Sequence, residues 1–372
     1  MAISHFYPPR RTLMGPGPSD VNPQVLAALA KPTIGHLDPL FINLMEETKA
    51  LLQYAFQTQN EFTIAVSAPG SAGMETCFVN LVEPGDKVIV CINGVFGSRM
   101  KENVIRCGGE AIVVEQEWGR AVDPDAVETA LKANPDAKFL AFVHAETSTG
   151  ARSDAKALCA LAQQYNCLSI VDAVTSLGGI ELRVDDWGID AIYSGSQKCL
   201  SCVPGISPVS LSAKAVAKIK ARKTPVQSWF LDQTLVMGYW SGEGKRSYHH
   251  TAPVNSIYAL HESLLLLQQE TLEASWQRHQ TQHEALKAGL LDLGLEFVVP
   301  KDERLPQLNT VRIPQGVDDA TVRQYLLNEY NLEIGAGLGA FAGNAWRIGL
   351  MGYAAKSENV LLCLAALKKA LS

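Results

Sequence analysis

Residues 168–198 read LSIVDAVTSLGGIELRVDDWGIDAIYSGSQK, and this stretch decides the fold. An apolar run at Leu168–Asp172 ends in a carboxylate, and a second run at Ala191–Ser194 leads almost directly to Lys198. Short runs rich in Val and Ile, apolar on both faces, are typical of strands buried between two helix layers. The separation between Asp172 and Lys198 leaves room for one crossover and one strand, so we expect both side chains to face one crevice.

Outward from this stretch, short β-rich runs alternate with longer helical runs from about residue 60 to residue 220. This alternation predicts a mostly parallel, doubly wound α/β sheet. The expected strands are Phe62–Ser67, Lys87–Ile92, Ala111–Glu115, Phe139–His144, Leu168–Asp172, Ala191–Ser194 and Ile206–Leu211, with helices near 71–82, 96–107, 124–133 and 154–166. Ligands bind beyond the carboxyl ends of such strands. Four residues with useful chemistry fall there: Gly70, Thr147, Asp172 and Lys198.

The pattern changes after residue 250. Pro253 opens a long helical stretch to about Leu293, and strand-like segments follow at Leu295–Val299 and Asn309–Ile313. A helix near 319–330, a strand around Arg347 and a last helix from about residue 357 complete this αβ set. We expect an N-terminal segment (1–20), a large domain (21–255) and a smaller C-terminal αβ domain with a long linking helix (256–372).

Composition excludes several classes of partner. The 372 residues are 47% hydrophobic and 19% charged, with a formal net charge of -6. This mild acidity argues against nucleic acid or an anionic membrane surface as the main partner. No apolar stretch approaches the roughly 18 residues that a membrane span needs. The N-terminus lacks the pattern of a secretory signal, so we expect a cytoplasmic enzyme.

Three other patterns are weaker. Cys199 and Cys202 form a C-x-x-C, but one such pair without nearby histidines is more typical of reduced packing thiols than of zinc or redox chemistry. His249 and His250 are adjacent, and neighbours do not usually converge on one metal, so we expect no metal site. Residues 335–339 (GAGLG) resemble a dinucleotide loop only superficially, because no helix or matching acidic residue follows. A flexible active-site loop near Arg347 is the better interpretation.

Lys198 is the residue with the most distinctive predicted chemistry. Burial after a strand disfavours the ammonium form of a lysine, which makes the amine a nucleophile toward an aldehyde. A lysine that holds pyridoxal phosphate as a Schiff base needs this property, although a lone strand-end lysine is more often a surface residue. Asp172 strengthens the case, because the cofactor's ring nitrogen must stay protonated and a buried carboxylate holds that proton. A helix cap or a structural ion pair is the alternative for Asp172.

A possible phosphate site precedes these residues in the chain. Residues 68–75 (APGSAGME) place small residues between a strand and a helix. Free backbone N–H groups and the helix dipole at such a turn form a phosphate cradle, although glycines are common there. Ser196 and Gln197 could add donors to the same phosphate.

An ordered set of motifs spans nearly the whole chain. It comprises GPGPS at 15–19, EPGD at 83–86, ETSTG at 146–150, Asp172, YSGSQK at 193–198, YHHT at 248–251 and RIGL at 347–350. With these motifs the chain resembles the class V aminotransferases of fold type I, in particular the alanine–glyoxylate and serine–pyruvate aminotransferase family.

The resemblance implies pyridoxal 5'-phosphate as cofactor and a homodimer with shared active sites. Lys198 would carry the cofactor and shuttle the proton, Asp172 would pair with the ring nitrogen, and Arg347 would bind the substrate carboxylate through a bidentate pair. The other implied cofactor contacts are Val174 on the ring, Thr147 near the phenolic oxygen, Gly70, Ser71, Ala72 and Gln197 on the phosphate, and Tyr248 and Thr251 reaching the phosphate from the second subunit. Two positions depart from the animal enzymes: Phe96 replaces a ring-stacking Trp, and Ser71 replaces a His.

The expected reaction is a ping-pong transfer of an amino group from alanine or serine to glyoxylate or pyruvate. Arg347 is the one arginine clearly placed for a carboxylate, which favours small donors. Alternatives are a transaminase for 2-aminoethylphosphonate or ureidoglycine, and a pyridoxal-phosphate lyase or cysteine desulfurase. A desulfurase needs a reactive cysteine on a mobile loop, whereas Cys363 falls in an apolar helical run. The third class is a non-enzymatic nucleotide-binding module of doubly wound fold.

Overall fold

The computed structural model describes residues 3–240 and 246–372. Residues 1–2 and 241–245, which belong to the predicted units 1–20 and 21–255, lie outside the described residues. Across the described part of the chain, no helix is both long and apolar enough to cross a membrane.

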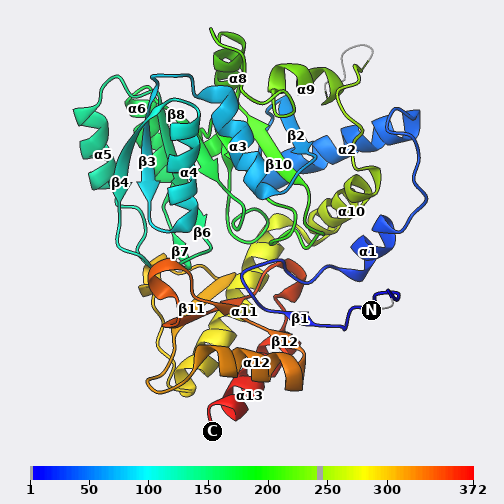
Figure 1. The fold of residues 1–372 in the computed structure, drawn as a ribbon, viewed down its shortest axis with the longest axis vertical. Helices are drawn as coiled ribbons and strands as arrows, with labels where there is room; N and C mark the ends of the chain where they lie inside the picture. The colour runs from blue at the N-terminus through cyan, green and yellow to red at the C-terminus, as the bar shows by residue number, and fades with distance from the viewer. Residues whose placement is uncertain (1–2, 241–245) are drawn as a thin grey trace.

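A seven-stranded sheet organises the larger part of the molecule (Figure 1). In spatial order it contains β2 (Phe62–Val66), β10 (Ser207–Leu211), β9 (Ala191–Tyr193), β8 (Leu168–Asp172), β5 (Phe139–Val143), β3 (Lys87–Ile92) and β4 (Glu110–Glu115). β10 runs antiparallel to both of its neighbours, and the other pairs are parallel. The sheet is therefore mostly parallel, as the alternation of strands and helices predicts.

The crossover helices begin where the sequence supplies helix-start signals. α5 (Pro124–Ala133) has proline in its first turn, and the Asp123 side chain caps the backbone N–H of Asp125. α6 (Ala155–Gln164) is capped by Asp154 in the same manner. The other predicted crossover helices are α3 (Gly70–Leu81) and α4 (Val95–Arg106), and the short α7 (Val184–Trp187) and α8 (Ala213–Lys220) follow later.

Three further helices flank the sheet. α1 (Pro23–Leu29) starts at the predicted Asn22–Pro23 signal, and α9 (Gln233–Trp240) follows α8. α2 (Pro39–Phe56) is a long helix that the sequence analysis does not predict, although Asp38 and Pro39 form the same cap-then-proline signature. It packs along α10 (Val254–Glu270), and its buried face joins the core of the large sheet.

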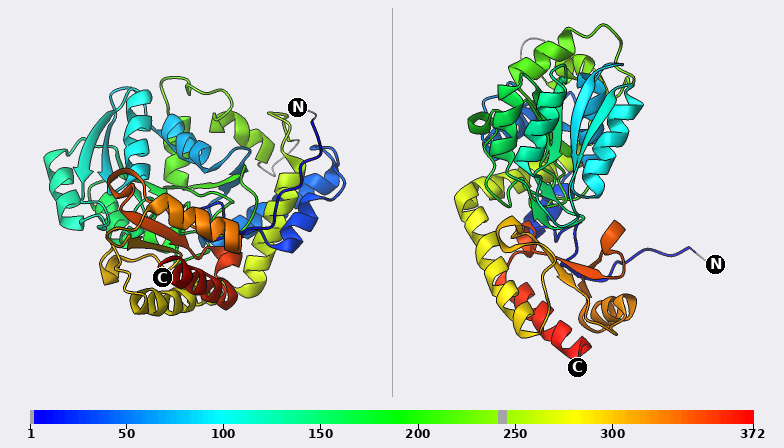
Figure 2. Two further views of the ribbon diagram at one scale, coloured as in Figure 1. Left: turned by 60° about the horizontal axis from the view of Figure 1, so that its bottom comes forward. Right: turned by 90° about the vertical axis from the view of Figure 1, so that its left-hand side faces the viewer.

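The predicted continuous helix from Pro253 to about Leu293 is wrong in one respect. The chain forms α10 and α11 (Leu272–Asp292), separated by Thr271 with a φ of 73°. Thr271 ends one helix and its side chain caps the next, so the apolar pattern continues across a break. In the right-hand view of Figure 2 this pair of helices runs along one side of the molecule, from the large sheet to the C-terminal elements.

The C-terminal elements form a second core around a small antiparallel sheet. Its strand order is β11 (Leu308–Arg312), β14 (Ala345–Gly349) and β13 (Gly335–Ala336), and α12 (Asp319–Tyr330) and α13 (Ser357–Ala370) complete the set. The predicted strand Leu295–Val299 is wrong, because this segment makes only an isolated bridge between Phe297 and Val311 before Pro300. β1 (Thr12–Leu13) pairs with β12 (Leu332–Glu333), which ties the N-terminal segment to this core.

Candidate active site

Lys198 lies in the loop after β9, and its side chain is buried, with 8% of the residue exposed. The ammonium Nζ donates to the backbone carbonyl of Pro16. Burial and the nearby Arg347 cation lower the pKa of Lys198 to about 8, while Cys199, Asp172 and Glu146 oppose that shift. The amine therefore loses its proton much closer to neutral pH than an exposed lysine does.

Asp172 ends β8 and is almost fully buried. Its Oδ1 accepts from the backbone N–H of Val174, and its Oδ2 accepts from the hydroxyl of Tyr193, both at 2.8 Å. Burial raises the pKa of Asp172 to about 7, against these two hydrogen bonds and the attraction of Lys198. No helix begins at the turn after Asp172, so the helix-cap alternative is wrong. Within residues 3–240 and 246–372, Asp172 also forms no salt bridge.

The glycine-rich turn lies beside the Lys198 loop. α3 starts at Gly70 after Pro69, and no side chain caps its first turn. A Cβ at Gly70 would lie 3.5 Å from both Gly195 Cα and Val174 Cγ2, which brings three chain segments together. The Gln197 Oε1 is buried here without a partner among the described residues. Backbone N–H groups at this helix start could therefore hold an anionic group.

Arg347 approaches the same place from the small sheet. It lies on β14 and is 7% exposed. Its Nε donates to Ala336 O at 2.8 Å and its Nη1 to Thr147 O at 3.0 Å. Burial lowers the pKa of Arg347 to about 10, and no acidic side chain forms a salt bridge with it in the described chain. The guanidinium can therefore bind an external carboxylate.

The remaining predicted residues divide into two groups. Thr147 is buried and its hydroxyl bonds to that of Thr175 at 2.5 Å, while the half-buried Phe96 ring has the Arg99 guanidinium 4.9 Å from its centroid. Ser71, Ala72, Tyr248 and Thr251 are exposed or half-buried. Tyr248 lies beside His36, with ring centroids 5.5 Å apart. The predicted roles of Tyr248 and Thr251 depend on a second subunit and stay predictions.

Tyr193 and Glu146 have contacts in the site that the sequence did not predict. Tyr193 pairs with Asp172 in the register between β9 and β8, so the strand alignment would have predicted their contact. Glu146 is a fully buried acid in an otherwise apolar and hydroxyl-rich run, which is an uncommon place for a carboxylate. The segment at 335–339, expected as a loop, begins with strand β13, and Gly339–Phe341 form a 3-10 turn.

All eight cysteines are buried and free, and burial raises the pKa of Cys199, Cys202 and Cys363 to about 12 each. Over residues 3–240 and 246–372, no cluster of three or more His, Cys, Asp or Glu side chains could hold a metal ion.

The described site thus offers four kinds of contact at the strand ends: an uncapped helix start for an anion, a buried carboxylate for a cationic ring, a buried amine for an aldehyde, and a buried guanidinium for a carboxylate. These contacts come from segments far apart in the sequence, joined by the parallel strands and by the small sheet. Such a combination suits a phosphorylated aromatic aldehyde together with an amino acid.

Comparison with known proteins agrees with this geometry. The sequence profile described as "Aminotransferase class-V" matches residues 17–359. Alanine–glyoxylate aminotransferase of Rattus norvegicus is 42% identical over 98% of this chain and 88% of its own length, and (S)-ureidoglycine–glyoxylate transaminase of Bacillus subtilis is 37% identical over 98% and 91%.

Among solved structures, alanine–glyoxylate aminotransferase from Nostoc sp. superposes with a TM-score of 0.97 at 45% identity, covering 100% of this chain and 98% of the other. The predicted fold class, fold type I with a mostly parallel sheet, is thereby confirmed. Family profile, sequence identity and fold all extend over nearly the whole chain, and we conclude that this protein belongs to the class V aminotransferase family.

Proposed function

We propose that this aminotransferase uses pyridoxal 5'-phosphate to move an amino group from alanine or serine to glyoxylate or pyruvate. The observation that carries the proposal is the buried Lys198 amine, which lies under the influence of the Asp172 carboxylate and of the Arg347 guanidinium. An amine with a lowered pKa, an acid for a ring nitrogen and a cation for a carboxylate are the three groups that the reaction requires.

The residues present fit this cofactor. The phosphate would lie at the start of α3, on Gly70, Ser71 and Ala72, with Gln197 beside it. Asp172 would face the ring nitrogen, Val174 and Phe96 would pack on the ring, and Thr147 would approach the phenolic oxygen. When bound, pyridoxal phosphate supplies an electron sink for the bonds at the amino acid α-carbon. The pKa of Asp172, which burial raises to about 7 in the chain alone, suits a carboxylate whose charge a pyridinium would stabilise.

The chain's own groups perform the proton transfer and the substrate binding. Lys198 Nζ would take the α-carbon proton from the amino donor and pass it to the cofactor's C4′ carbon, and would move a proton in the opposite direction for the acceptor, because its pKa of about 8 allows both forms near neutral pH. Arg347 holds the substrate carboxylate through nitrogens that its bonds to Ala336 and Thr147 leave free. These two bonds also fix the guanidinium plane, so that the α-carbon is presented to the amine in one orientation.

Small substrates are the inferred class. Arg347 is one buried cation for one carboxylate, and relatives named for alanine and glyoxylate are about 40–42% identical over 98% of this chain. Ureidoglycine is the second candidate donor, because the relative named for it matches over the same extent at 37% identity. Glyoxylate is the acceptor named in both groups of relatives. Cysteine desulfuration is not supported, since Cys363 is buried with its pKa raised to about 12.

A homodimer with shared active sites is part of this proposal. Trp229 and Tyr248 are exposed members of one aromatic cluster, which runs from Trp229 through His249, His250, Tyr239 and His36 to Tyr248. Leu37, which follows His36 in the chain, and Leu40 are also exposed. These residues mark the face that we assign to the second copy. A second copy would cover this face and bring Tyr248 and Thr251 to a phosphate. Light scattering that gives the mass of a monomer would contradict it. A cytoplasmic location stays a prediction.

The test is an absorbance spectrum of the purified protein with pyridoxal phosphate, compared with that of Lys198→Ala. We expect a visible band that requires Lys198, that alanine or serine bleaches and that glyoxylate restores. Measuring the bleaching rates with alanine, serine and ureidoglycine ranks the donors. Lys101→Ala, which removes an exposed lysine of α4, is the matched control variant and should keep the band.

A band that persists unchanged in Lys198→Ala would remove the assigned role of Lys198. A wild-type protein that shows no band at all with added pyridoxal phosphate would contradict the cofactor assignment. If ureidoglycine bleaches the band fast while alanine and serine do not, ureidoglycine is the amino donor. The assignments of the cofactor and of Lys198 would then still hold.

A further inference from the structure

Glu146 ends the short strand β6 (Ala145–Glu146), and its fully buried carboxylate reaches the start of α4. Its Oε2 accepts from the backbone N–H groups of Phe96 and Gly97, at 3.1 and 3.4 Å. Its Oε1 accepts from the backbone N–H and the hydroxyl of Ser148, at 3.0 and 2.6 Å. One side chain therefore connects the helix that carries Phe96 to the segment that carries Thr147.

The contacts around Glu146 leave little freedom. The Ser148 Oγ also accepts from the backbone N–H of Val95 at 2.9 Å, which adds a second connection to the same helix start. A Cβ at Gly94 would overlap both Ser148 Oγ and the Glu146 carboxyl carbon, so glycine allows this close approach. A carboxylate that accepts backbone N–H groups at a helix start is also stabilised by the helix dipole.

The same segment reaches the substrate side of the site. Thr147, between Glu146 and Ser148, accepts from Arg347 Nη1 through its backbone oxygen and bonds Thr175 through its hydroxyl. The Glu146 charge also acts directly on buried cations, since it raises the pKa of both Arg347 and Lys198 against the effect of burial. Displacement of this segment would thus move Phe96 and Arg347 together.

We propose that Glu146 is a positioning residue that fixes the ring-stacking Phe96 and, through the backbone of Thr147, the carboxylate-binding Arg347. This inference rests on the proposed function, because it takes Phe96 to stack on the cofactor ring. Both carboxylate oxygens of Glu146 are occupied by donors of the chain, so we assign Glu146 an indirect role. It sets the distance between Phe96 on α4 and Arg347 on β14, which lie on two sides of the site.

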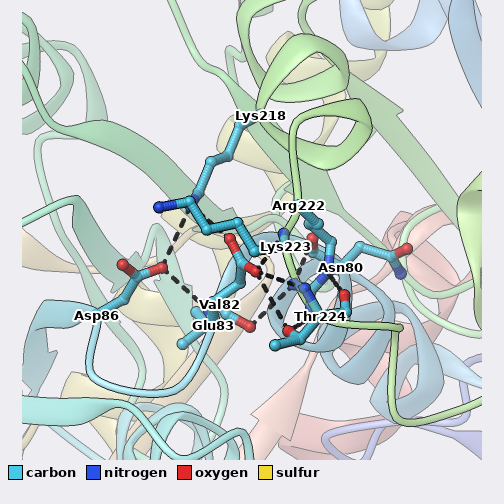
Figure 3. Close-up of polar contacts among 8 residues, drawn as sticks. All are labelled: Asn80, Val82, Glu83, Asp86, Lys218, Arg222, Lys223 and Thr224. Atoms are coloured by element: carbon cyan, nitrogen blue, oxygen red, sulfur yellow. Dashed lines mark hydrogen bonds and ion pairs between the residues drawn. The ribbon is translucent and has the colours of Figure 1, made fainter.

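The test compares Glu146→Gln with a matched control, Glu83→Gln. Figure 3 shows the Glu83 cluster, where this carboxylate also accepts four donors. These are the backbone N–H groups of Lys223 and Thr224, the Thr224 hydroxyl and Lys218 Nζ. Glu83 follows α3 at the turn before β3 and has no part in the proposed machinery, so its loss reports only the general effect of removing a carboxylate that accepts several hydrogen bonds.

In Glu146→Gln the amide N–H₂ must face a backbone N–H donor, either of Phe96 and Gly97 or of Ser148, so the start of α4 or the segment at Ser148 must shift. We expect pyridoxal phosphate to bind the cofactor-free chain roughly tenfold more weakly. Quenching of tryptophan fluorescence during a titration measures this affinity. We also expect a changed visible circular dichroism of the bound cofactor, and a KM for alanine raised more than kcat is lowered. Glu83→Gln should leave all three unchanged.

The outcomes separate the two proposals. If the wild-type chain binds no pyridoxal phosphate, the proposed function fails. If the wild type binds it and Glu146→Gln shows wild-type affinity, dichroism and KM, the positioning role is overturned while the proposed function stands. A Glu146→Gln variant that differs only in melting temperature, as Glu83→Gln would, also overturns it. Ser148→Ala, which loses one of the connections, is expected to change the same three quantities less.

Discussion

Asp172 has both of its carboxylate oxygens occupied by donors from the chain itself. Val174 supplies a backbone N–H and Tyr193 a hydroxyl, each at 2.8 Å. The two donors fix the plane of the carboxylate and partly offset the burial that raises its pKa to about 7. Because hydrogen bonds to the charged form favour ionisation, Tyr193 keeps Asp172 better prepared to accept a cationic ring than burial alone would.

Tyr193→Phe tests this point at the scale of one atom. The phenyl ring fills the same space, but Asp172 Oδ2 loses its donor, so we expect roughly tenfold weaker affinity for pyridoxal phosphate. Fluorescence titration of the cofactor-free chain measures it. Tyr165→Phe is the matched control, because the Tyr165 hydroxyl also donates to a carboxylate, Glu128, at 2.8 Å, and that pair lies between two crossover helices. Equal affinities for the two variants would show that Tyr193 does not act through Asp172.

The family resemblance was needed to assign Arg347, whereas residue type and position along the chain were enough to predict that Asp172 and Lys198 face one crevice. Each of these charged residues stands in or next to an apolar strand, where an unpaired charge is costly, and parallel strands bring their carboxyl ends to one edge. Tyr193 and Glu146 were not predictable in this manner. Their contacts depend on strand register and on side-chain direction, neither of which composition or periodicity contains.

At the scale of elements, the segment Gly15–Ser19 crosses directly over Lys198. Pro16 O accepts from Lys198 Nζ, and the Ser19 hydroxyl donates to Lys198 O at 2.7 Å. Gly17 has a φ of 106°, and a Cβ there would lie 2.6 Å from Lys198 Nζ. Since the nearest atoms are the far end of a flexible side chain, an added methyl would displace the lysine before it displaced the backbone.

Gly17→Ala is therefore expected to fold and yet to lower activity by about 10²-fold, because Lys198 moves away from the reacting carbon. Gly316→Ala is the control: Gly316 also has a positive φ, 83°, but its Cβ would meet open space. Both variants should lose about 1–3 kcal/mol of stability from backbone strain. Activity assays and thermal melts of both variants distinguish crowding of Lys198, expected in Gly17→Ala alone, from backbone strain, expected in both. Similar activities in the two variants would show that this segment does not control Lys198.

Element boundaries in the large sheet were predictable because turns, glycines and prolines separate its apolar runs. The failures have local causes. Thr271 separates α10 from α11 although no glycine or proline is nearby, so the sequence pattern gives no sign of the break. Leu295–Val299 has the composition of a strand, yet it pairs with β11 only around Phe297 before the chain turns at Pro300. Whether such a segment forms a strand depends on the strands available to pair with it, and these cannot be inferred from the segment's own sequence.

At the scale of the whole molecule, His279 connects α11 to the turn before α13. Its Nδ1 donates to Ser275 O at 2.7 Å, and its Nε2 accepts from the backbone N–H of Gly352 at 2.9 Å. The ring must therefore be neutral in the folded protein. Burial and the neighbouring Arg278 lower the pKa of His279 to about 4, from a usual value of 6.5. Burial likewise lowers the pKa of His144, which packs edge-on against Trp187, to about 3.

The lowered pKa values of His279 and His144 predict how the free energy of unfolding changes with pH below neutral. Between pH 6.5 and about 4, the unfolded chain binds protons at these positions that the folded chain does not, so stability falls as pH decreases through this window. For His279 alone the loss is on the order of 3 kcal/mol. His279→Gln should be less stable than wild type at pH 7.5, because it loses the bond to Gly352, but its melting temperature should depend less steeply on pH.

Thermal melts from pH 7.5 to pH 4 on wild type, His279→Gln and His261→Gln test this prediction. His261 is an appropriate control because its Nε2 contacts the exposed Glu47 side chain at the surface of α10 and does not connect α11 to the C-terminal turn. We expect the melting temperature of the His261 variant to depend on pH as steeply as that of the wild type. The pH dependence of the His279 variant should be weaker and should arise from His144 and other groups. Parallel curves for all three proteins would mean that His279 takes up its proton without breaking the connection between α11 and the C-terminal turn, and that acid instability arises elsewhere.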